Sequence, residues 1–179
     1  EPWKQRVAAA CAGWQRSHYG WDVDPSIIRV VPDVLEAYEI FLRELVGAGN
    51  SVIVPTPAYM PFLSVPKLYD VDVIEIEMLQ SGDAETGEAQ WVFDFDAIER
   101  AFAAGCHAFV LCNPHNPIGK VLTLEEELRL SDLAAQYDVR IFNDEIHAPF
   151  VFEGKHIPFP TISEQAALQS VSYTHLRAH

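Results

Sequence analysis

Two runs of polar residues hold most of the side chains in this sequence that could bind or polarise a small molecule. Residues 113–120 follow the apolar run 109–112, and residues 143–147 follow the mostly apolar run 139–142. Short apolar runs of this kind are typical of buried strands. In open, mostly parallel α/β sheets, ligands bind at the carboxyl ends of the strands. We therefore expect the two polar runs to converge on one ligand.

The first polar run contains two prolines and a glycine between residues 113 and 119. Such a composition predicts a rigid turn between a strand and a helix. Asn116 stands between Pro114 and Pro117, so its amide would be held in place as a donor for a ligand oxygen. The pattern alone leaves both interpretations open, a purely structural turn and a preorganised ligand contact.

The second polar run places acids and a histidine directly after an apolar strand. Asp144 could cap the start of a helix, or it could pair with a buried cation. His115, Asp144, Glu145 and His147 are also metal-ligand types, but they lack the paired-histidine spacing of common zinc motifs. We therefore predict no metal site.

Two further segments could contact a ligand. Residues 28–33 lead an extended apolar piece into a helix that we expect to begin at Pro32, with Asp33 in its first turn. The free backbone N–H groups at such a helix start can bind a phosphate group. Tyr59 follows two prolines and could stack on a ligand ring or belong to the core.

Helical and strand patterns alternate along the chain. Apolar residues recur at helical spacing in residues 2–19 and 33–46. Capping boxes, Asp96 with Glu99 and Thr123 with Glu126, predict helices that end near residues 104 and 137. Strands are predicted at residues 51–55, 71–78, 109–112 and 139–142, and a solvent-exposed excursion at 80–90. This alternation predicts an α/β fold with a mostly parallel sheet flanked by helices.

The composition limits the partners that we expect. The chain has 179 residues, 49% of them hydrophobic, and a formal net charge of -14. This length suits one domain, and the acidic charge disfavours nucleic acid and anionic membranes as partners. Three cysteines without metal or redox spacing favour buried thiols and a reducing, cytoplasmic location.

Several motifs together resemble one enzyme family. The string Asn-Pro-Ile-Gly at 116–119, Asp144 with His147 three residues later, and Pro-Ala-Tyr at 57–59 resemble class I/II aminotransferase-like enzymes, which use pyridoxal 5′-phosphate (PLP). The longer strings at 111–117, 144–148 and 156–159 are similar to the cystathionine β-lyase (C–S lyase) branch. The resemblance covers Trp14 to about Phe159. It implies part of the large PLP-binding domain of an aspartate-aminotransferase-like fold.

The resemblance also implies roles for the residues that match its motifs. Asp144 would pair with the pyridine nitrogen of PLP, and Asn116 and His147 would hydrogen-bond its phenolic oxygen. Tyr59 would stack on the ring face. The phosphate would lie at the helix that begins at Pro32, against the backbone of Arg29, Val30 and Val31, although many relatives have Gly or Ser where Arg29 stands.

The reaction implied is α,β-elimination on an L-amino acid that carries sulfur at Cβ, giving thiol, pyruvate and ammonia. Transamination is the alternative that the sequence does not separate from it. A non-catalytic PLP-binding sensor module is a further alternative. A nucleotide-binding domain is disfavoured because no Gly-x-Gly-x-x-Gly string follows a predicted strand.

The chain departs from the family because the lysine that forms the Schiff base with PLP is missing at the expected position. None of Lys4, Lys67, Lys120 and Lys155 matches the family position, and Lys120 reads as a surface cation. We expect residues 1–171 to be an incomplete large domain and 172–179 an aberrant tail, with the N-terminal arm and small C-terminal domain of relatives absent. We therefore expect this chain to be inactive. The resemblance also implies that the intact parent protein is a homodimer, because the family's active sites lie at a subunit interface.

Overall fold

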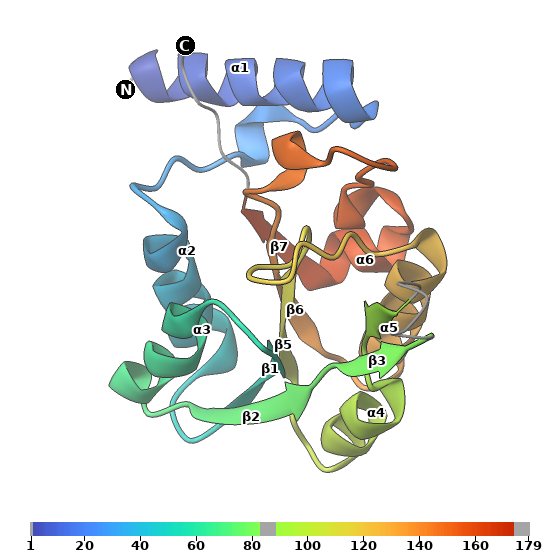
Figure 1. Ribbon diagram of the computed structural model, residues 1–179. Coiled ribbons are helices and arrows are strands. Elements are labelled where there is room, and N and C mark those ends of the chain that lie inside the picture. The colour runs from blue at the N-terminus through green and yellow to red at the C-terminus, as the bar shows by residue number, and fades with distance from the viewer. Residues whose placement is uncertain (1, 83–88, 174–179) are drawn as a thin grey trace.

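The computed structural model describes residues 2–82 and 89–173. Five strands form one sheet in the order β2-β1-β5-β6-β7, and every neighbouring pair is parallel. The strands are β1 (Ser51–Thr56), β2 (Asp72–Glu77), β5 (Ala108–Cys112), β6 (Arg140–Asp144) and β7 (Ser170–Tyr173). The predicted α/β fold with a parallel sheet is confirmed (Figure 1).

Helices cover both faces of this sheet (Figure 1). The α-helices are α1 (Pro2–Tyr19), α2 (Val34–Phe41), α3 (Met60–Ser64), α4 (Phe95–Ala103), α5 (Leu124–Gln136) and α6 (Glu164–Gln169). Within the described ranges, none of them combines the length and apolar character needed to cross a bilayer.

The sheet separates two apolar cores because successive side chains of a strand point to opposite faces. Phe109 and Leu111 of β5 pack with residues of α4, α5 and α6. Ala108, Val110 and Cys112 of the same strand pack with residues of α2 and α3 on the other face. A side chain at the end of β5 or β6 therefore belongs to one of these two faces according to its position in the alternation.

Helix α1 has the bounds that the sequence predicts, and it lies at one end of the molecule (Figure 1). The ring of Tyr19, its last residue, meets the ring of His156 edge to face, with centroids 5.4 Å apart. Gly20 then takes a φ of 71°, a conformation that glycine adopts without steric cost.

The start of α2 differs from the prediction. The helix begins at Val34, and Asp33 is its N-cap, since the Asp33 carboxylate accepts a hydrogen bond from the backbone N–H of Glu36 at 2.9 Å. Pro32 therefore precedes the cap and does not open the helix. After Phe41 the helix continues as a π-helix, Leu42–Val46, and ends at Gly47.

The two predicted capping boxes have different outcomes. The Thr123–Glu126 box at the start of α5 is confirmed in both of its hydrogen bonds. The Asp96–Glu99 box is wrong, because α4 begins at Phe95 and is capped by Asp94, whose carboxylate accepts from the N–H of Ala97 at 2.9 Å. Asp96 is the second residue of the helix, where it cannot act as the N-cap.

Two segments outside the main sheet complete the fold. A 3₁₀ helix, Pro25–Ile27, leads into extended backbone at Ile28, which lies outside the five-stranded sheet. In the predicted excursion at 80–90, strands β3 (Leu79–Ser81) and β4 (Gln90–Val92) pair antiparallel, and residues 83–88 lie outside the described ranges. At the other end, β7 continues past residue 171, the predicted domain boundary, and residues 174–179 lie outside the described ranges.

Candidate functional site

The two polar runs meet at the carboxyl edge of the sheet. Strands β5 and β6 are parallel neighbours, and their last residues, Cys112 and Asp144, lie opposite each other. The backbone N–H of Asn113 donates to the carbonyl oxygen of Asp144 at 3.0 Å. The predicted placement of both runs at adjacent strand ends is confirmed.

The loop after β5 is held by hydrogen bonds that fix its backbone. The amide oxygen of buried Asn113 accepts from the N–H of Leu122 at 3.0 Å, which ties the start of the loop to its end. Within the loop, the N–H of His115 donates to the carbonyl of Lys120 at 2.7 Å, and the N–H of Gly119 donates to the carbonyl of His115 at 2.7 Å. Rigidity of this loop, expected from its prolines, thus has a second source in these bonds.

A buried glutamate on α5 anchors the same loop. The amide nitrogen of Asn113 donates to the carboxyl group of Glu127 at 2.7 Å. Burial, together with the charges of Glu145 and Glu126, raises the pKa of Glu127 to about 8, against the opposing effect of the Asn113 hydrogen bond. Burial therefore favours the neutral form of Glu127 beside the loop. No local pattern singles out Glu127, which is one of several glutamates on the predicted helix.

Asn116 projects from this anchored loop beside an open hollow. Its backbone N–H donates to the sulfur of Cys112 at 3.4 Å, which places it over the end of β5. Asn116 and His147 line the same hollow of about 530 Å³, together with Phe150, Phe152 and neighbouring residues of the two loops. The structure therefore brings together Asn116 and His147, which the sequence predicted to share a ligand.

Asp144 lies below this loop in a buried position. It is 4% exposed, and one carboxylate oxygen lies 4.0 Å from the Cys112 sulfur. Since paired residues of parallel strands share a face, Asp144 lies on the sheet face of Cys112 and α2. Burial raises the pKa of Asp144 to about 6, and the nearby charge of Glu145 adds to the effect, while a hydrogen bond from the N–H of Ile146 opposes it.

The sequence left three other roles open for Asp144: a helix cap, a partner of a buried cation and a metal ligand. It accepts from the N–H of Ile146, two residues on, at 3.1 Å, so it caps a tight turn and not an α-helix. No lysine or arginine of residues 2–82 and 89–173 forms an ion pair with it. Those same ranges contain no group of three or more His, Cys, Asp or Glu side chains placed to hold a metal ion.

Tyr59 follows the carboxyl end of β1, the strand next to β5. It is half-buried, packs against the core on the α2 face, and meets Phe62 edge to face at 5.5 Å. A hydrogen bond of 2.8 Å from the ring of His115 to the carbonyl of Pro57 ties the Tyr59 turn to the Asn116 loop. Tyr59, Asn116 and Asp144 thus lie at the carboxyl ends of three neighbouring strands, at one edge of the sheet.

The predicted phosphate segment lies before α2, a helix that packs against β6 and β7. The Arg29 guanidinium donates to the carbonyls of Ser26, at 2.6 Å, and Ile28, at 3.3 Å, so it folds back on its own turn. Val30 and Val31 are partly buried. In the part of the chain that the structure describes, no hydrogen bond joins these residues to Asn116, Asp144 or His147.

Lys120 is not the surface cation that the sequence suggested. Its ammonium group lies 2.8 Å from the carboxylate of Glu126, and the two side chains are only 10% and 15% exposed. The pairing follows from the Thr123–Glu126 capping box, which holds Glu126 at the start of α5 beside the loop. Lys120 therefore braces the loop, and its ion pair makes it a poor nucleophile.

A second group of buried polar residues lies beside Asp144. The carboxyl group of Glu145 accepts from the N–H of Phe159 at 2.8 Å and lies 3.4 Å from the ring of His156. Glu145 and His156 are both almost fully buried. This group fixes the segment 145–159 against the sheet, and the sequence pattern gave no indication of the pairing.

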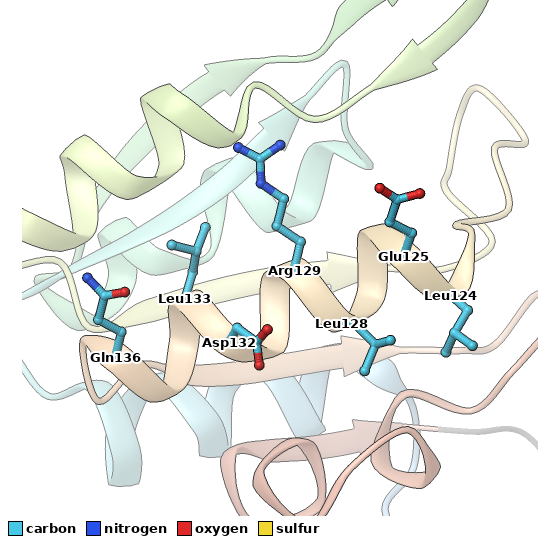
Figure 2. Close-up of a pocket in the computed structure, with 7 residues that line it drawn as sticks. All are labelled: Leu124, Glu125, Leu128, Arg129, Asp132, Leu133 and Gln136. Carbon is cyan, nitrogen blue, oxygen red and sulfur yellow. The ribbon is translucent and has the colours of Figure 1, made fainter.

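A larger hollow, of about 650 Å³, lies elsewhere on the molecule. Figure 2 shows that its lining residues all come from α5: Leu124, Glu125, Leu128, Arg129, Asp132, Leu133 and Gln136. It contains no residue of either polar run, and one helix alone forms its walls. The hollow at the strand ends is therefore the better candidate site, in agreement with the general position of ligands in parallel α/β sheets.

Known proteins resemble this chain in sequence. The chain matches the family Aminotransferase class I and II over residues 6–174. It is 36% identical over 165 residues to a cystathionine beta-lyase of Corynebacterium glutamicum, and 30% identical over 170 residues to the cystathionine beta-lyase PatB of Bacillus subtilis. These matches cover 92% and 94% of this chain, but 42% of each relative.

A solved structure extends the comparison to three dimensions. Cystalysin from Treponema denticola, whose crystal structure contains a PLP cofactor, matches with a TM-score of 0.85 and 28% identity. The match covers 96% of this chain and 42% of that one. The chain thus spans less than half the length of the relatives it matches. By sequence and by fold, it belongs to the aminotransferase class I and II family, and within that family to the cystathionine β-lyase branch.

Proposed function

We propose that this chain is the cofactor-holding part of a PLP-dependent C–S β-lyase, which eliminates thiol from cystathionine or cysteine-type amino acids. The observation that carries the proposal is the buried carboxylate of Asp144 at the end of β6, beside Cys112 and beneath the Asn116 loop. A carboxylate in this position is stabilised by a cationic partner, and a protonated pyridine nitrogen is such a partner.

The other residues of the edge suit the remaining parts of the cofactor. Asn116 and His147 line the hollow and carry groups that can donate to the phenolic oxygen of PLP. Tyr59 offers an aromatic face next to that loop.

For the phosphate, we propose the backbone of Arg29, Val30 and Val31 with the start of α2. Asp33 accepts from the N–H of Glu36, so one of the four N–H groups at this helix start already has a partner. A phosphate bound there would accept hydrogen bonds from the backbone N–H groups that precede Glu36 in the first turn of the helix.

The proposed chemistry depends on a proton on the ring nitrogen of the bound cofactor. When bound, PLP supplies a ring that withdraws electrons from the substrate Cα and stabilises negative charge there. The carboxylate of Asp144 would keep the ring nitrogen protonated, and this would strengthen that withdrawal. Asn116 and His147 would orient the ring through its phenolic oxygen, and the hydrogen-bonded loop after β5 holds Asn116 in place.

This chain alone is proposed to lack turnover, because none of its lysines matches the position of the family's Schiff-base lysine. We propose that the described residues, from Pro2 through β7, belong to the large PLP-binding domain. Incubation of the chain with cystathionine and PLP should release no thiol above a protein-free control, and thiol release would contradict this part of the proposal.

PLP binding by the 179-residue chain tests the cofactor site directly. Calorimetric titration with PLP measures the Kd of the unmodified chain and of Asp144→Ala. The Kd of Asp144→Ala should be at least tenfold higher, because the ring nitrogen loses its charged partner. Asp132→Asn is the control, because Asp132 is an exposed acid on α5, and this variant should leave the Kd unchanged. Equal affinity of Asp144→Ala and the unmodified chain would overturn the proposed role of Asp144.

Aminotransferase activity of the parent protein is the second candidate, favoured by the match to the Aminotransferase class I and II family. The two reactions differ in whether thiol or a new amino acid is released. An assay of the parent protein with cystathionine, with and without a 2-oxo acid acceptor, separates them. A non-catalytic sensor module would bind PLP and give neither product.

A further inference from the structure

His115 connects the two loops that flank the candidate site. Its ring nitrogen Nε2 lies 2.8 Å from the carbonyl oxygen of Pro57, a residue 58 positions earlier in the chain. The side chain is buried, with an exposed fraction of 3%. One side chain therefore joins the loop after β5 to the turn after β1.

The chemistry of the bond defines the state of the ring. A backbone carbonyl can only accept a hydrogen bond, so Nε2 must carry the proton. Burial lowers the pKa of His115, and the positive charge of Lys120 lowers it further, against the opposing effect of the nearby carbonyls of Pro57 and Cys112. The ring is thus neutral at physiological pH, with the Nε2–H tautomer in place to donate.

Both ends of this connection are close to residues of the site. His115 directly precedes Asn116, and its own backbone N–H and C=O are bonded to Lys120 and Gly119. Pro57 stands two residues before Tyr59. Because the backbone of His115 is fixed on one side, its ring limits how far the Tyr59 turn can move away.

We propose that His115 is a positioning residue that sets the separation between Tyr59 and Asn116, and thereby the width of the space between them that takes the cofactor ring. The inference rests on the proposed function, since it assigns Tyr59 to the face of the ring and Asn116 to its edge. His115 itself touches neither the cofactor nor the substrate in this assignment.

Three substitutions separate this role from a general packing role. His115→Leu fills much of the same volume without a donor. His115→Gln carries an amide nitrogen that reaches about as far as Nε2, and the shorter side chain of His115→Asn does not. His107→Leu is the matched control, because exposed His107 also bonds a backbone carbonyl, that of Tyr137 at 2.8 Å, but at the opposite edge of the sheet.

Two measurements on the 179-residue chain test the proposal. Hydrogen exchange, read by mass spectrometry, should speed up in residues 56–62 and 115–120 together in His115→Leu. Calorimetric titration should show a Kd for PLP about tenfold higher in that variant, the size of effect expected for one lost hydrogen bond. His115→Gln should restore both values to within about threefold, and His107→Leu should change neither.

The possible results are distinguishable. Unchanged exchange in His115→Leu, or faster exchange with unchanged PLP affinity, would overturn the positioning role. If the unmodified chain binds no PLP while exchange still responds to His115→Leu, the connection between the loops stands and the proposed function fails. If His115→Leu does not fold, the comparison of His115→Gln with His115→Asn decides the question in the same way.

Discussion

Asp144 occupies a place where an unpaired carboxylate is unfavourable. It is 4% exposed, and burial raises its pKa to about 6, from an ordinary value of 3.8. A group of this kind destabilises the ligand-free fold and is kept where a ligand later supplies the opposite charge. The residue is therefore better explained by ligand binding than by stability.

This explanation predicts how pH changes the stability of the ligand-free chain. Because the pKa of Asp144 is higher in the folded than in the unfolded state, its charge costs stability above about pH 6, and the cost disappears as pH falls below about 4. Asp144→Asn keeps an acceptor for the N–H of Ile146 but has no charge. It should raise the free energy of unfolding by up to about 3 kcal/mol at pH 7.5, and by little at pH 4.

Urea denaturation at both pH values measures this difference. Asp132→Asn serves as the control, because Asp132 is exposed on α5. With saturating PLP the order should reverse, because only the carboxylate pairs with a protonated ring nitrogen. A uniform effect of Asp144→Asn at both pH values would show that the charge of Asp144 is not penalised in the fold.

Residue types were easier to predict from the sequence than residue partners. The sequence pointed to Asn116, Asp144 and His147 because amides, acids and imidazoles at strand ends are unusual enough to be noticed. It did not point to the bond between Asn113 and Glu127, which are 14 positions apart on a loop and a helix. Such a pairing depends on how α5 packs over the loop, which the local sequence does not contain.

At the scale of elements, the start of α4 gives a direct test of the corrected cap. The carboxylate of Asp94 accepts from the N–H of Ala97, so Asp94→Ala should lower the free energy of unfolding by about 1 kcal/mol. Asp96→Ala should cost less than about 0.5 kcal/mol, because Asp96 makes only an exposed ion pair with Arg129 at 3.6 Å. Urea denaturation of the two variants makes the comparison, and a larger loss for Asp96→Ala would restore the original prediction.

The two-residue error in the cap of α4 has a physical origin. Both Asp94 and Asp96 are good N-cap residues, and only Asp96 has a glutamate three positions later. The observed start buries Phe95 at the first helical position, in edge-to-face contact with Phe93. Core packing therefore selected the cap, which local propensity could not do. Four of the five strands of the central sheet were easier to predict, since short buried runs such as 109–112 have few alternatives. The fifth strand, β7, was not predicted.

At the scale of the whole molecule, the sheet gathers residues from three separate parts of the chain at one edge. Parallel strands in the order β1-β5-β6 bring residues near positions 59, 116 and 144 to neighbouring strand ends. The alternation of helices and strands predicted a mostly parallel sheet, but not the order of its strands. The composition could not predict which surfaces stay uncovered, because that depends on what the chain packs against.

One uncovered surface adjoins the site itself. Phe152 and Phe150 are 93% and 56% exposed, and both line the hollow with Asn116 and His147. Large exposed aromatic side chains placed close together favour association between molecules. The homodimer expected of the intact parent protein stays a prediction, and association of this chain can be tested by itself.

The 179-residue chain should therefore self-associate through this surface. Sedimentation at rising concentration should show a weight-average mass that increases above that of the monomer. The double substitution Phe150→Ser and Phe152→Ser should lower the association constant at least tenfold, because it removes two large apolar side chains that would be buried on contact. Leu168→Ser is the matched control, since Leu168 is 77% exposed on α6. If the control reduces association as much as the double variant, the aromatic pair is not the contact, and general exposure of apolar groups explains the behaviour instead.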